Sequence, residues 1–199
     1  HFYHKTNNKK YLDVVEKLLL SLSSRGIYDH LEGGISRYTV DEKWIVPHFE
    51  KMLYDNIQYV SLLNNYLSNK ESDYLKYKLK QTIKFINSEF LLKNGLLGSA
   101  YDADSDGVEG KYYVWDYEEL KDILGNDFEI FKKKYQVSER GNFEGSNILV
   151  ENLASNIGKE SNIEKIEQKL LEIRNKRNKP FFDDKSQTDL NTFWIYVNL

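Results

Sequence analysis

The chain has 199 residues, of which 40% are apolar and 14% aromatic, so it is long enough to bury a core within one domain. Its net charge of −3 argues against a nucleic-acid-binding or membrane-surface protein, because both normally carry a basic patch. The sequence contains no cysteine, which excludes disulfides, thiolate nucleophiles and cysteine-ligated zinc.

No apolar run approaches the length of a transmembrane helix, and no signal-peptide pattern opens the sequence. We therefore expect a cytoplasmic protein whose partners include neither nucleic acid nor a membrane. The sequence begins with His1, and its last residues, 193–199, are largely apolar. We expect residues 1–199 to form a single partial domain of a longer protein, truncated at both ends.

Residues 8–24 have the spacing of an amphipathic helix, with apolar side chains at Leu12, Val15, Leu19 and Leu22. Asn7 or Asn8 can cap its start, and Gly26 suits the left-handed position after its end. The segment 26–46 that follows is too long for a simple connector, and loops of this length in compact domains are usually functional or disordered. Its many aromatic and aliphatic side chains argue against disorder.

Gly33-Gly34 within this segment lets the backbone turn tightly or approach a ligand. No helix follows at the spacing of a phosphate-binding loop, so the sequence gives little support to a nucleotide site. Pro47 then stands where prolines open helices, and residues 47–67 are predicted to form a helix. That helix would place His48, Asp55 and Tyr59 on one side.

Two further features follow from a helix over residues 47–67. Lys51 and Asp55, four residues apart, would form an ion pair. Glu50 and Tyr54 would project from another side.

Residues 71–93 predict the next helix, whose four lysines are expected to form a solvated outer face: Lys76, Lys78, Lys80 and Lys84.

The hydrophobic period changes after Gly95. Two short strands are predicted around residues 97–101 and 111–115, joined by an acidic, glycine-containing loop. Asp116 with Glu119 predicts a capping box for a helix over residues 117–124. Further elements are expected at 127–136 (helix), 147–150 (strand), 161–175 (helix, opened by Ser161 with Glu164) and from 181 onward. The predicted fold is mainly α, a partial (α/α)6 toroid of helical hairpins with a small β-hairpin inserted in a loop.

The acidic loop begins like a calcium-binding loop, Asp102-Ala-Asp104-Ser-Asp106-Gly107, but its twelfth position is Tyr113 instead of glutamate. Two alternatives are a β-turn capped by its own aspartates and a pair of carboxylates aimed into a cleft. In an extended conformation Asp102 and Asp104 point the same way. Two carboxylates at one site can divide acid and base roles, and Glu109 is a further candidate.

His48 can be a structural imidazole or a functional one. Only His30 and His48 stand away from the terminus, and a zinc site needs three or four ligands, so we predict no metal and no cofactor. Arg37 can tie the loop to Asp41, or it can clamp a carboxylate or a sugar hydroxyl. The aromatic residues near these acids can be core, or they can stack on a sugar.

Three stretches, Gly26 to Asp55, AYDADSDGVEGKYYVW and KPFFDDKSQT, resemble the spermatogenesis-associated, thioredoxin-domain-containing protein family with its bacterial YyaL-like members. The resemblance spans about Leu12 to Thr188. It implies a thioredoxin-like domain, absent here, followed by an (α/α) barrel similar to N-acylglucosamine 2-epimerases and six-hairpin glycosidases. The rest of the barrel and the thioredoxin-like domain would then be partners in the intact protein.

Two departures from the family pattern stand out. Where the family usually has Gly-Gly-Gly-Phe-His-Arg-Tyr, this sequence has Glu32 for the first glycine and Ile35-Ser36 for Phe-His. Where Thr-x-Trp-Asn-Gly is expected near the end, it has residues 188–192, Thr-Asp-Leu-Asn-Thr. If the family histidine takes part in chemistry, this chain lacks it.

The hypothesis is a carbohydrate-active barrel that performs acid/base chemistry on a sugar, as an epimerase or a glycosidase. The predicted catalytic residues are His48, Asp102, Asp104 and Glu109. The predicted substrate-binding residues are Arg37, Tyr38, Asp41, Trp44, Glu50, Lys51, Tyr54, Asp55 and Tyr101. The alternative is a non-catalytic barrel module that binds a glycan or a protein, with these charges in structural roles.

Overall fold

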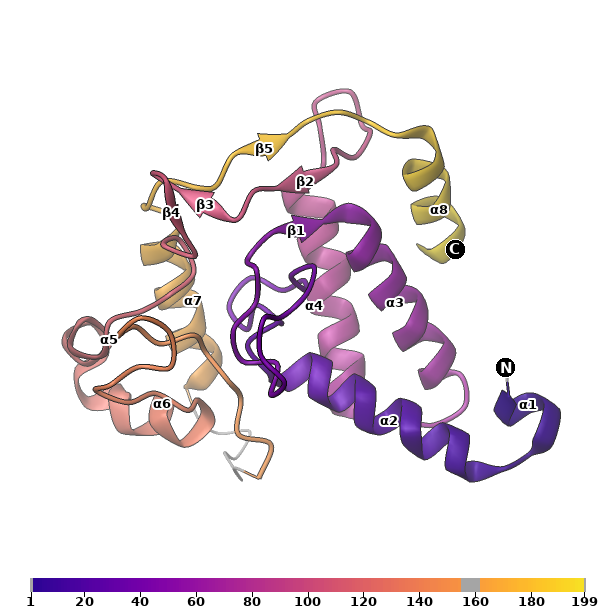
Figure 1. Ribbon diagram of the computed structural model, residues 1–199, viewed down its shortest axis with the longest axis horizontal. Helices are drawn as coiled ribbons and strands as arrows, with labels where there is room; N and C mark the ends of the chain where they lie inside the picture. Colours follow the sequence, from indigo (N-terminus) through magenta and orange to yellow (C-terminus); the bar gives the residue numbers. More distant parts are fainter. Residues whose placement is uncertain (1, 155–161, 199) are drawn as a thin grey trace.

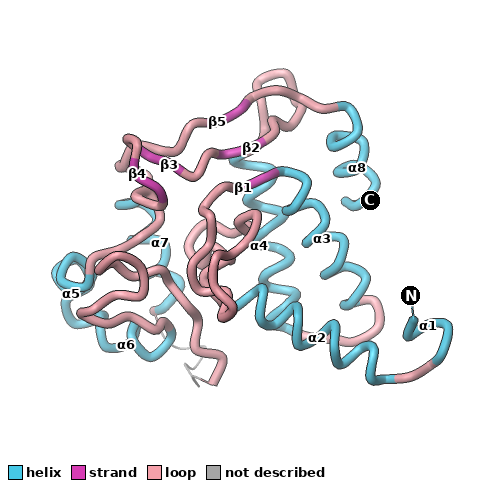
Figure 2. The backbone as a smooth tube through the Cα atoms, viewed as in Figure 1, coloured by secondary structure: helices cyan, strands magenta, loops and turns pink. Residues whose placement is uncertain are grey.

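The computed structural model describes residues 2–154 and 162–198. The chain is mainly helical with a few very short strands, which confirms the predicted class (Figures 1 and 2). The helices are α1 Phe2–Thr6, α2 Lys9–Ser24, α3 Leu53–Leu67, α4 Asp73–Glu89, α5 Tyr117–Leu124, α6 Phe128–Lys134, α7 Ile163–Arg174 and α8 Thr188–Asn198. The strands are β1 Lys51–Met52, β2 Ala100–Tyr101, β3 Asp104–Ser105, β4 Val108–Glu109 and β5 Phe182–Asp183.

The helices form two groups on either side of the loop 25–50 (Figure 1). In the first group, α2, α3 and α4 share a core that includes Leu19 and Leu63, and Trp194 of α8 packs against α3 and α4. In the second group, α5, α6 and α7 bury Phe131 and Leu170 around Trp115. The loop between the groups is therefore in a position to carry contacts from both.

Helix α2 confirms the predicted helix over 8–24, and the Asn8 side chain caps it by accepting from Lys10 N. The prediction for Gly26 was wrong, because this glycine does not adopt a positive φ. A Cβ at Gly26 would collide with the carbonyl oxygen of Ile45. Gly26 is needed for close packing of the loop on itself rather than for a left-handed cap.

The helix predicted over 47–67 begins only at Leu53. Pro47 instead pairs with Thr39 in an isolated antiparallel bridge, and Lys51–Met52 forms β1, paired with β2. Burial alternates along residues 47–51: Pro47, Phe49 and Lys51 are buried, whereas His48 and Glu50 are partly exposed. His48 therefore does not share a helix face with Asp55.

Helix α4 confirms the helix predicted over 71–93, with Ser72 as its N-cap. Its lysines do not all face solvent as predicted. Lys76, Lys80 and Lys84 are exposed, but Lys78 is buried. The tertiary structure buries Lys78 because ionic partners from other segments reach it, as described below.

The predicted β-hairpin is present but is shorter and lies elsewhere. Strands β3 and β4 pair antiparallel around Asp106-Gly107, both with positive φ, which is the two-residue turn that an Asp-Gly pair favours. Residues 111–115 form no strand; Trp115 makes a single bridge with Asn147. Strand β2 belongs instead to a three-stranded sheet in the order β1-β2-β5.

The second group of helices follows the sequence closely. Asp116 caps α5 by accepting from Glu118 N and Glu119 N, although the Glu119 carboxylate pairs with Arg177 instead of closing a capping box. Helices α6 and α7 match the predicted segments, and Ser161, the expected start of α7, lies outside the described residues. Residues 147–150, predicted as a strand, are extended and form only the bridge at Asn147.

Candidate functional site

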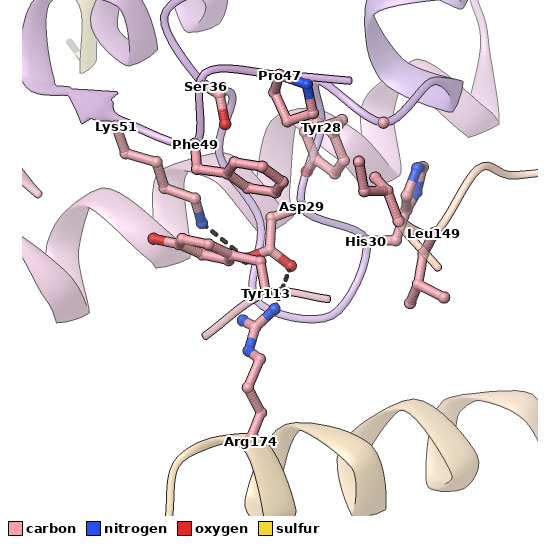
Figure 3. Close-up of a pocket in the computed structure, with 12 residues that line it drawn as sticks. Tyr28, Asp29, His30, Ser36, Pro47, Phe49, Lys51, Tyr113, Leu149 and Arg174 are labelled. Carbon is pink, nitrogen blue, oxygen red and sulfur yellow. Dashed lines mark hydrogen bonds and ion pairs between the residues drawn. The ribbon is translucent and has the colours of Figure 1, made fainter. Parts of the chain in front are cut away.

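A buried acid, Asp29, lies between two cations that come from distant segments (Figure 3). Lys51 Nζ donates to Asp29 Oδ2 at 2.7 Å, and an Arg174 guanidinium nitrogen donates to Asp29 Oδ1 at 2.9 Å. A second guanidinium nitrogen of Arg174 donates to Glu32 at 3.2 Å. We call Asp29, Glu32, Lys51 and Arg174 the Asp29 network.

Burial and charge act in opposite directions on the Asp29 network. Burial alone would raise the pKa of Asp29, but the neighbouring Arg174 and Lys51 outweigh burial and hold the pKa well below its ordinary value. The same ion pairs raise the pKa of Arg174 against the effect of its burial. At Glu32 burial is the larger effect, and its pKa is raised. A charged Asp29 therefore belongs to the fold over the whole physiological pH range.

Gly33 and Gly34 explain how the loop brings Asp29 to this place. Both have positive φ, +98° and +82°, which glycine adopts without steric cost. Their Cα atoms press on α4, where a side chain at Gly34 would collide with the Phe85 ring. The glycine pair thus serves a tight turn packed on a helix instead of an approach to a ligand.

Asp29, Lys51 and Arg174 of this network line a small cavity of about 30 Å³, which is room for one or two water molecules (Figure 3). Ser36, which stands where the resemblance leads one to expect histidine, is buried and lines this cavity. The cavity is far smaller than the 300–1,000 Å³ or so of typical ligand pockets. The Asp29 network therefore holds the fold together and leaves no space for a sugar.

A second buried cluster lies beside the first and is centred on His30. His30 Nε2 donates to the Arg25 carbonyl at 3.1 Å, which leaves Nδ1 to accept from Lys78 Nζ at 3.2 Å. Glu151 accepts from Lys78 at 3.1 Å and from the Tyr74 hydroxyl at 2.8 Å. Burial, followed by the charge of Lys78, lowers the pKa of His30, so this imidazole is neutral at pH 7.

His48 and Glu109 are in contact on the outer side of the segment 47–51. The distance between His48 Nδ1 and Glu109 Oε1 is 2.8 Å, and the two side chains are 33% and 45% exposed. The ring of Tyr38 stacks on the imidazole, with centroids 4.8 Å apart and planes 14° apart. Asp104 stands directly opposite Glu109 in the hairpin, so the two side chains project from the same face. We call Tyr38, His48, Asp104 and Glu109 the His48 face.

Beside the His48 face, Arg37 donates to Glu50 at 3.1 Å. This ion pair is the leading cause that raises the pKa of Arg37, with a further contribution from Tyr54. Burial is the largest influence on Asp55 and raises its pKa to about 6. The charges of Arg37 and Glu50 also act on Asp55, with smaller and opposite effects. Its buried Oδ2 has no hydrogen-bond partner among the described residues. Asp55 is therefore partly protonated near pH 6.

Several residues predicted to bind substrate have structural partners instead. Lys51 does not pair with Asp55 as predicted but with Asp29. The Asp41 carboxylate accepts from the backbone of Lys43, Ile45 and Val46, and this fixes the turn that holds Trp44 at φ 58°. Arg37 pairs with Glu50 rather than with Asp41.

Tyr101 and Asp102 complete the predicted set. The Tyr101 ring stacks on Phe182, with centroids 4.7 Å apart, and its hydroxyl donates to the Glu89 carbonyl at 3.0 Å. Asp102 is exposed, like Asp104, and its carboxylate accepts from the following backbone amide. The structure thus brings His48, Asp104 and Glu109 together and places Tyr101 and Lys51 in packed positions.

The sequence-based prediction of site residues missed the buried charged residues that hold the loop 25–50 in place. Asp29, Lys78, Glu151 and Arg174 carry the strongest interactions of the loop 25–50, yet Arg174 is 145 residues from Asp29. No local pattern in the sequence links residues so far apart. Asp29 lies inside a stretch that resembles the family, which was the one available signal.

Two kinds of feature are absent from residues 2–154 and 162–198. No helix there is long and apolar enough to cross a membrane. Within the same residues, no three or more acids and histidines gather in a way that could hold a metal ion. Asp106 of the calcium-like loop instead pairs with Lys111 and accepts from Asn178.

Sequence comparison places these features in a family. No family model matches the chain. Human spermatogenesis-associated protein 20 is 28% identical over 205 residues, covering 84% of this chain and 26% of the human protein. The mouse protein of that name is 31% identical over 144 residues, 64% of this chain and 18% of its own length. An uncharacterised Caenorhabditis elegans protein is 31% identical over 145 residues, covering 65% of this chain and 20% of that protein.

The chain thus spans about a fifth to a quarter of the length of the curated relatives it matches. The human and mouse relatives carry the name of the family that the three sequence stretches resemble. The chain belongs to the spermatogenesis-associated protein 20 family.

Proposed function

We propose that the His48 face binds a sugar and moves protons on it by acid/base chemistry. The observation that carries this proposal is the 2.8 Å contact between His48 Nδ1 and Glu109 Oε1, which joins an imidazole and a carboxylate at an exposed surface. When Nδ1 donates to Glu109, Nε2 keeps its lone pair and points away from the pair as a base. Glu109 in this role orients the imidazole and stabilises the charge that forms when His48 takes up a proton.

The remaining parts of the face have matching roles. Tyr38 covers one side of the imidazole and is 46% exposed, so its ring offers a surface on which a sugar can stack. Asp104, and Asp102 on the same exposed side of the strand, provide the second proton-transfer group. Arg37 with Glu50, and Asp55 with its unpartnered oxygen, provide hydrogen bonds to hydroxyls.

A histidine–carboxylate pair supports epimerisation better than glycoside hydrolysis. An epimerase abstracts a proton from a carbon next to a carbonyl and returns it from an acid, for which an oriented imidazole suffices. A glycosidase requires two carboxyl groups about 5–9.5 Å apart on either side of the bond. Asp104 and Glu109 lie side by side on one hairpin face, and His48 already binds Glu109.

The fold proposed for the whole assembly is an (α/α)6 toroid to which these helical hairpins belong. The support is the packing of α3 on α4 as a hairpin, together with the small share of the relatives that this chain spans. The rest of that barrel and a thioredoxin-like domain are the proposed partners in the intact, cytoplasmic protein. The His48 face would then lie at the mouth of the barrel.

The alternative function is a non-catalytic module that binds a glycan or a protein. It is favoured by one observation: the side chains of His48 and Glu109 are open to solvent, and neither lines the small cavity beside Asp29. Binding of sugars such as N-acetylglucosamine and N-acetylmannosamine, measured by isothermal titration calorimetry, tests both versions. The sugar proposal predicts binding that falls at least about 10-fold in His48→Ala and Glu109→Gln.

A matched control comes from the same hairpin. Asp106→Asn removes the exposed pair with Lys111 at the hairpin tip, and asparagine tolerates the left-handed φ of Asp106. We expect its sugar affinity to equal that of the unmodified chain. Binding without any turnover would favour the module, and no binding to any sugar tested would contradict both carbohydrate versions.

A further inference from the structure

A polar groove of about 520 Å³ lies between α4 and α7, within the size range of ligand pockets. One wall is the exposed side of α4, the other is α7, and Glu32 belongs to its lining. The groove is lined by neither His48 nor Glu109, so it is separate from the His48 face. Its size is more than ten times that of the cavity beside Asp29.

The groove contains three carboxylates that are already held in place by cations. Glu32 accepts from Arg174 at 3.2 Å, Glu89 from Lys179 at 2.7 Å, and Glu167 from Lys134 at 2.6 Å. In each case the hydrogen bond engages one carboxylate oxygen. The second oxygen of each makes no hydrogen bond to a described residue, although that of Glu32 lies 3.9 Å from Lys179 Nζ. This oxygen can accept from a hydroxyl, and little conformational entropy is lost when it does so.

The groove also contains two lysines without a counter-charge. Lys80 and Lys84 line it from α4 and form no ion pair with any described residue. They are four residues apart on one helix face, where like charges are destabilising by a few tenths of a kcal/mol. Lys78, two residues before Lys80, is by contrast buried against Glu151. Two unpaired ammonium groups at the wall of a groove suit a ligand with negative charge.

Tyr77 adds a hydrogen-bond donor at the same wall. It is partly exposed in the groove and makes no hydrogen bond to any described residue. Burial, together with the charges of Glu167 and Glu164 on α7, raises the pKa of Tyr77 to about 12. Its hydroxyl therefore keeps its proton.

We propose that the α4–α7 groove binds an anionic, polyhydroxylated ligand, that is, a sugar that carries a carboxylate or a phosphate. Lys80 and Lys84 bind the anionic group. The free oxygens of the carboxylates, Glu32 among them, accept hydrogen bonds from the sugar hydroxyls. Tyr77 donates to the ligand or packs against its ring. This site does not depend on chemistry at the His48 face.

The test is calorimetric titration of the chain with D-glucuronate and with glucose 6-phosphate, compared with D-glucose and inorganic phosphate. The proposal predicts that at least one charged sugar binds about 10-fold more tightly than both glucose and phosphate, because charge and hydroxyls are both required. The variant Lys80→Gln/Lys84→Gln should lose about 10-fold in affinity for that sugar. Raising the salt concentration should weaken binding in the unmodified chain.

Lys76→Gln is the matched control, because Lys76 is exposed one turn earlier on the same helix and lies outside the groove. Its affinity should be unchanged, and His48→Ala should also bind the charged sugar normally, whatever becomes of the proposed acid/base function. Equal binding of glucose and the charged sugars would overturn the proposal. Equal affinity of the double variant and the unmodified chain, or an equal loss in Lys76→Gln, would overturn it as well.

Discussion

Arg174 and Asp29 are 145 residues apart in sequence, yet the guanidinium donates to the buried carboxylate at 2.9 Å. Asp29 belongs to the loop 25–50, and Arg174 ends α7 in the second group of helices. Lys51 occupies the other carboxylate oxygen at 2.7 Å. This acid therefore joins the loop 25–50 to β1 and to α7, and it fixes the segment that carries His48.

Asp29→Asn should destabilise the fold strongly. It leaves Lys51 and Arg174 buried with only Glu32 as a counter-charge, and breaking a buried ion pair in this way costs about 3–5 kcal/mol. Urea denaturation measures the change in the free energy of unfolding. Asp122→Asn, which alters an exposed aspartate, is the control and should change it by less than about 0.5 kcal/mol.

A second variant keeps this prediction informative if Asp29→Asn fails to fold. Lys51→Met/Asp29→Asn removes one of the two orphaned cations, so it should be less destabilised than Asp29→Asn alone. A double variant that is no more stable than the single one would contradict the assignment of Lys51 to the network. So would an Asp29→Asn chain within about 1 kcal/mol of the unmodified protein.

The His30 cluster predicts that stability falls on acidification. Because burial and Lys78 lower the pKa of His30, the unfolded chain takes up a proton near pH 6.5 and the folded chain only at lower pH. The unfolded state then binds more protons, so the free energy of unfolding decreases as the pH falls below about 6.5. The pKa of Glu151, which is also lowered, adds a further loss once the pH falls below about 4.5.

Denaturation curves between pH 4.5 and 8 measure this dependence. His30→Gln should be less stable than the unmodified chain above pH 6.5, and its stability should change less between pH 6.5 and 5. His4→Gln, at an exposed histidine, is the control and should leave the slope unchanged. A slope in His30→Gln as steep as that of the unmodified chain would assign the acid sensitivity to other groups.

Asp55 has the opposite effect on the pH dependence of the free energy of unfolding. Burial raises its pKa from 3.8 to about 6, so the folded state binds more protons than the unfolded state between these values. Its favourable contribution is complete below about pH 3.8 and is lost as the pH rises through about 6. Asp55→Asn should therefore stabilise the chain at pH 7.5, by about 1 kcal/mol after allowance for solvent screening of this half-buried group.

The same variant should give no gain at pH 4, where Asp55 is largely protonated in the folded chain. Thermal or urea denaturation at pH 4 and pH 7.5 provides the comparison, with Asp122→Asn again as the control. A stabilisation of equal size at both pH values would show that the effect does not come from the charge of Asp55.

The elements with regular periodicity could be predicted from the sequence, and the long-range ion pairs could not. Helices α2, α4 and α5 follow from their apolar spacing and from the caps Asn8, Ser72 and Asp116. Their own side chains determine these elements, so a local pattern suffices. The Asp-Gly turn of the hairpin was also visible, although the strands were placed too far from it.

The helix predicted to start at Pro47 was wrong because tertiary pairing overrode a local signal. Pro47 lies in a bridge with Thr39, Phe49 has a positive φ of 47°, and Lys51–Met52 pairs with β2, so this stretch stays non-helical until Leu53. That one change moves His48 away from Asp55 and toward Glu109. The pairing of His48 with Glu109 therefore depends on a hairpin 61 residues later, which no pattern around His48 indicates.

The most direct test of the proposed function is exchange of a sugar C–H proton with D₂O, followed by ¹H NMR in the presence of the chain. Acid/base chemistry at the His48 face predicts that the C2 proton of N-acetylglucosamine or N-acetylmannosamine is replaced by deuterium. The rate should fall at least about 100-fold in His48→Ala, as expected for loss of a general base, and stay unchanged in Asp106→Asn. No exchange with the unmodified chain, or equal exchange with His48→Ala, would contradict the proposal.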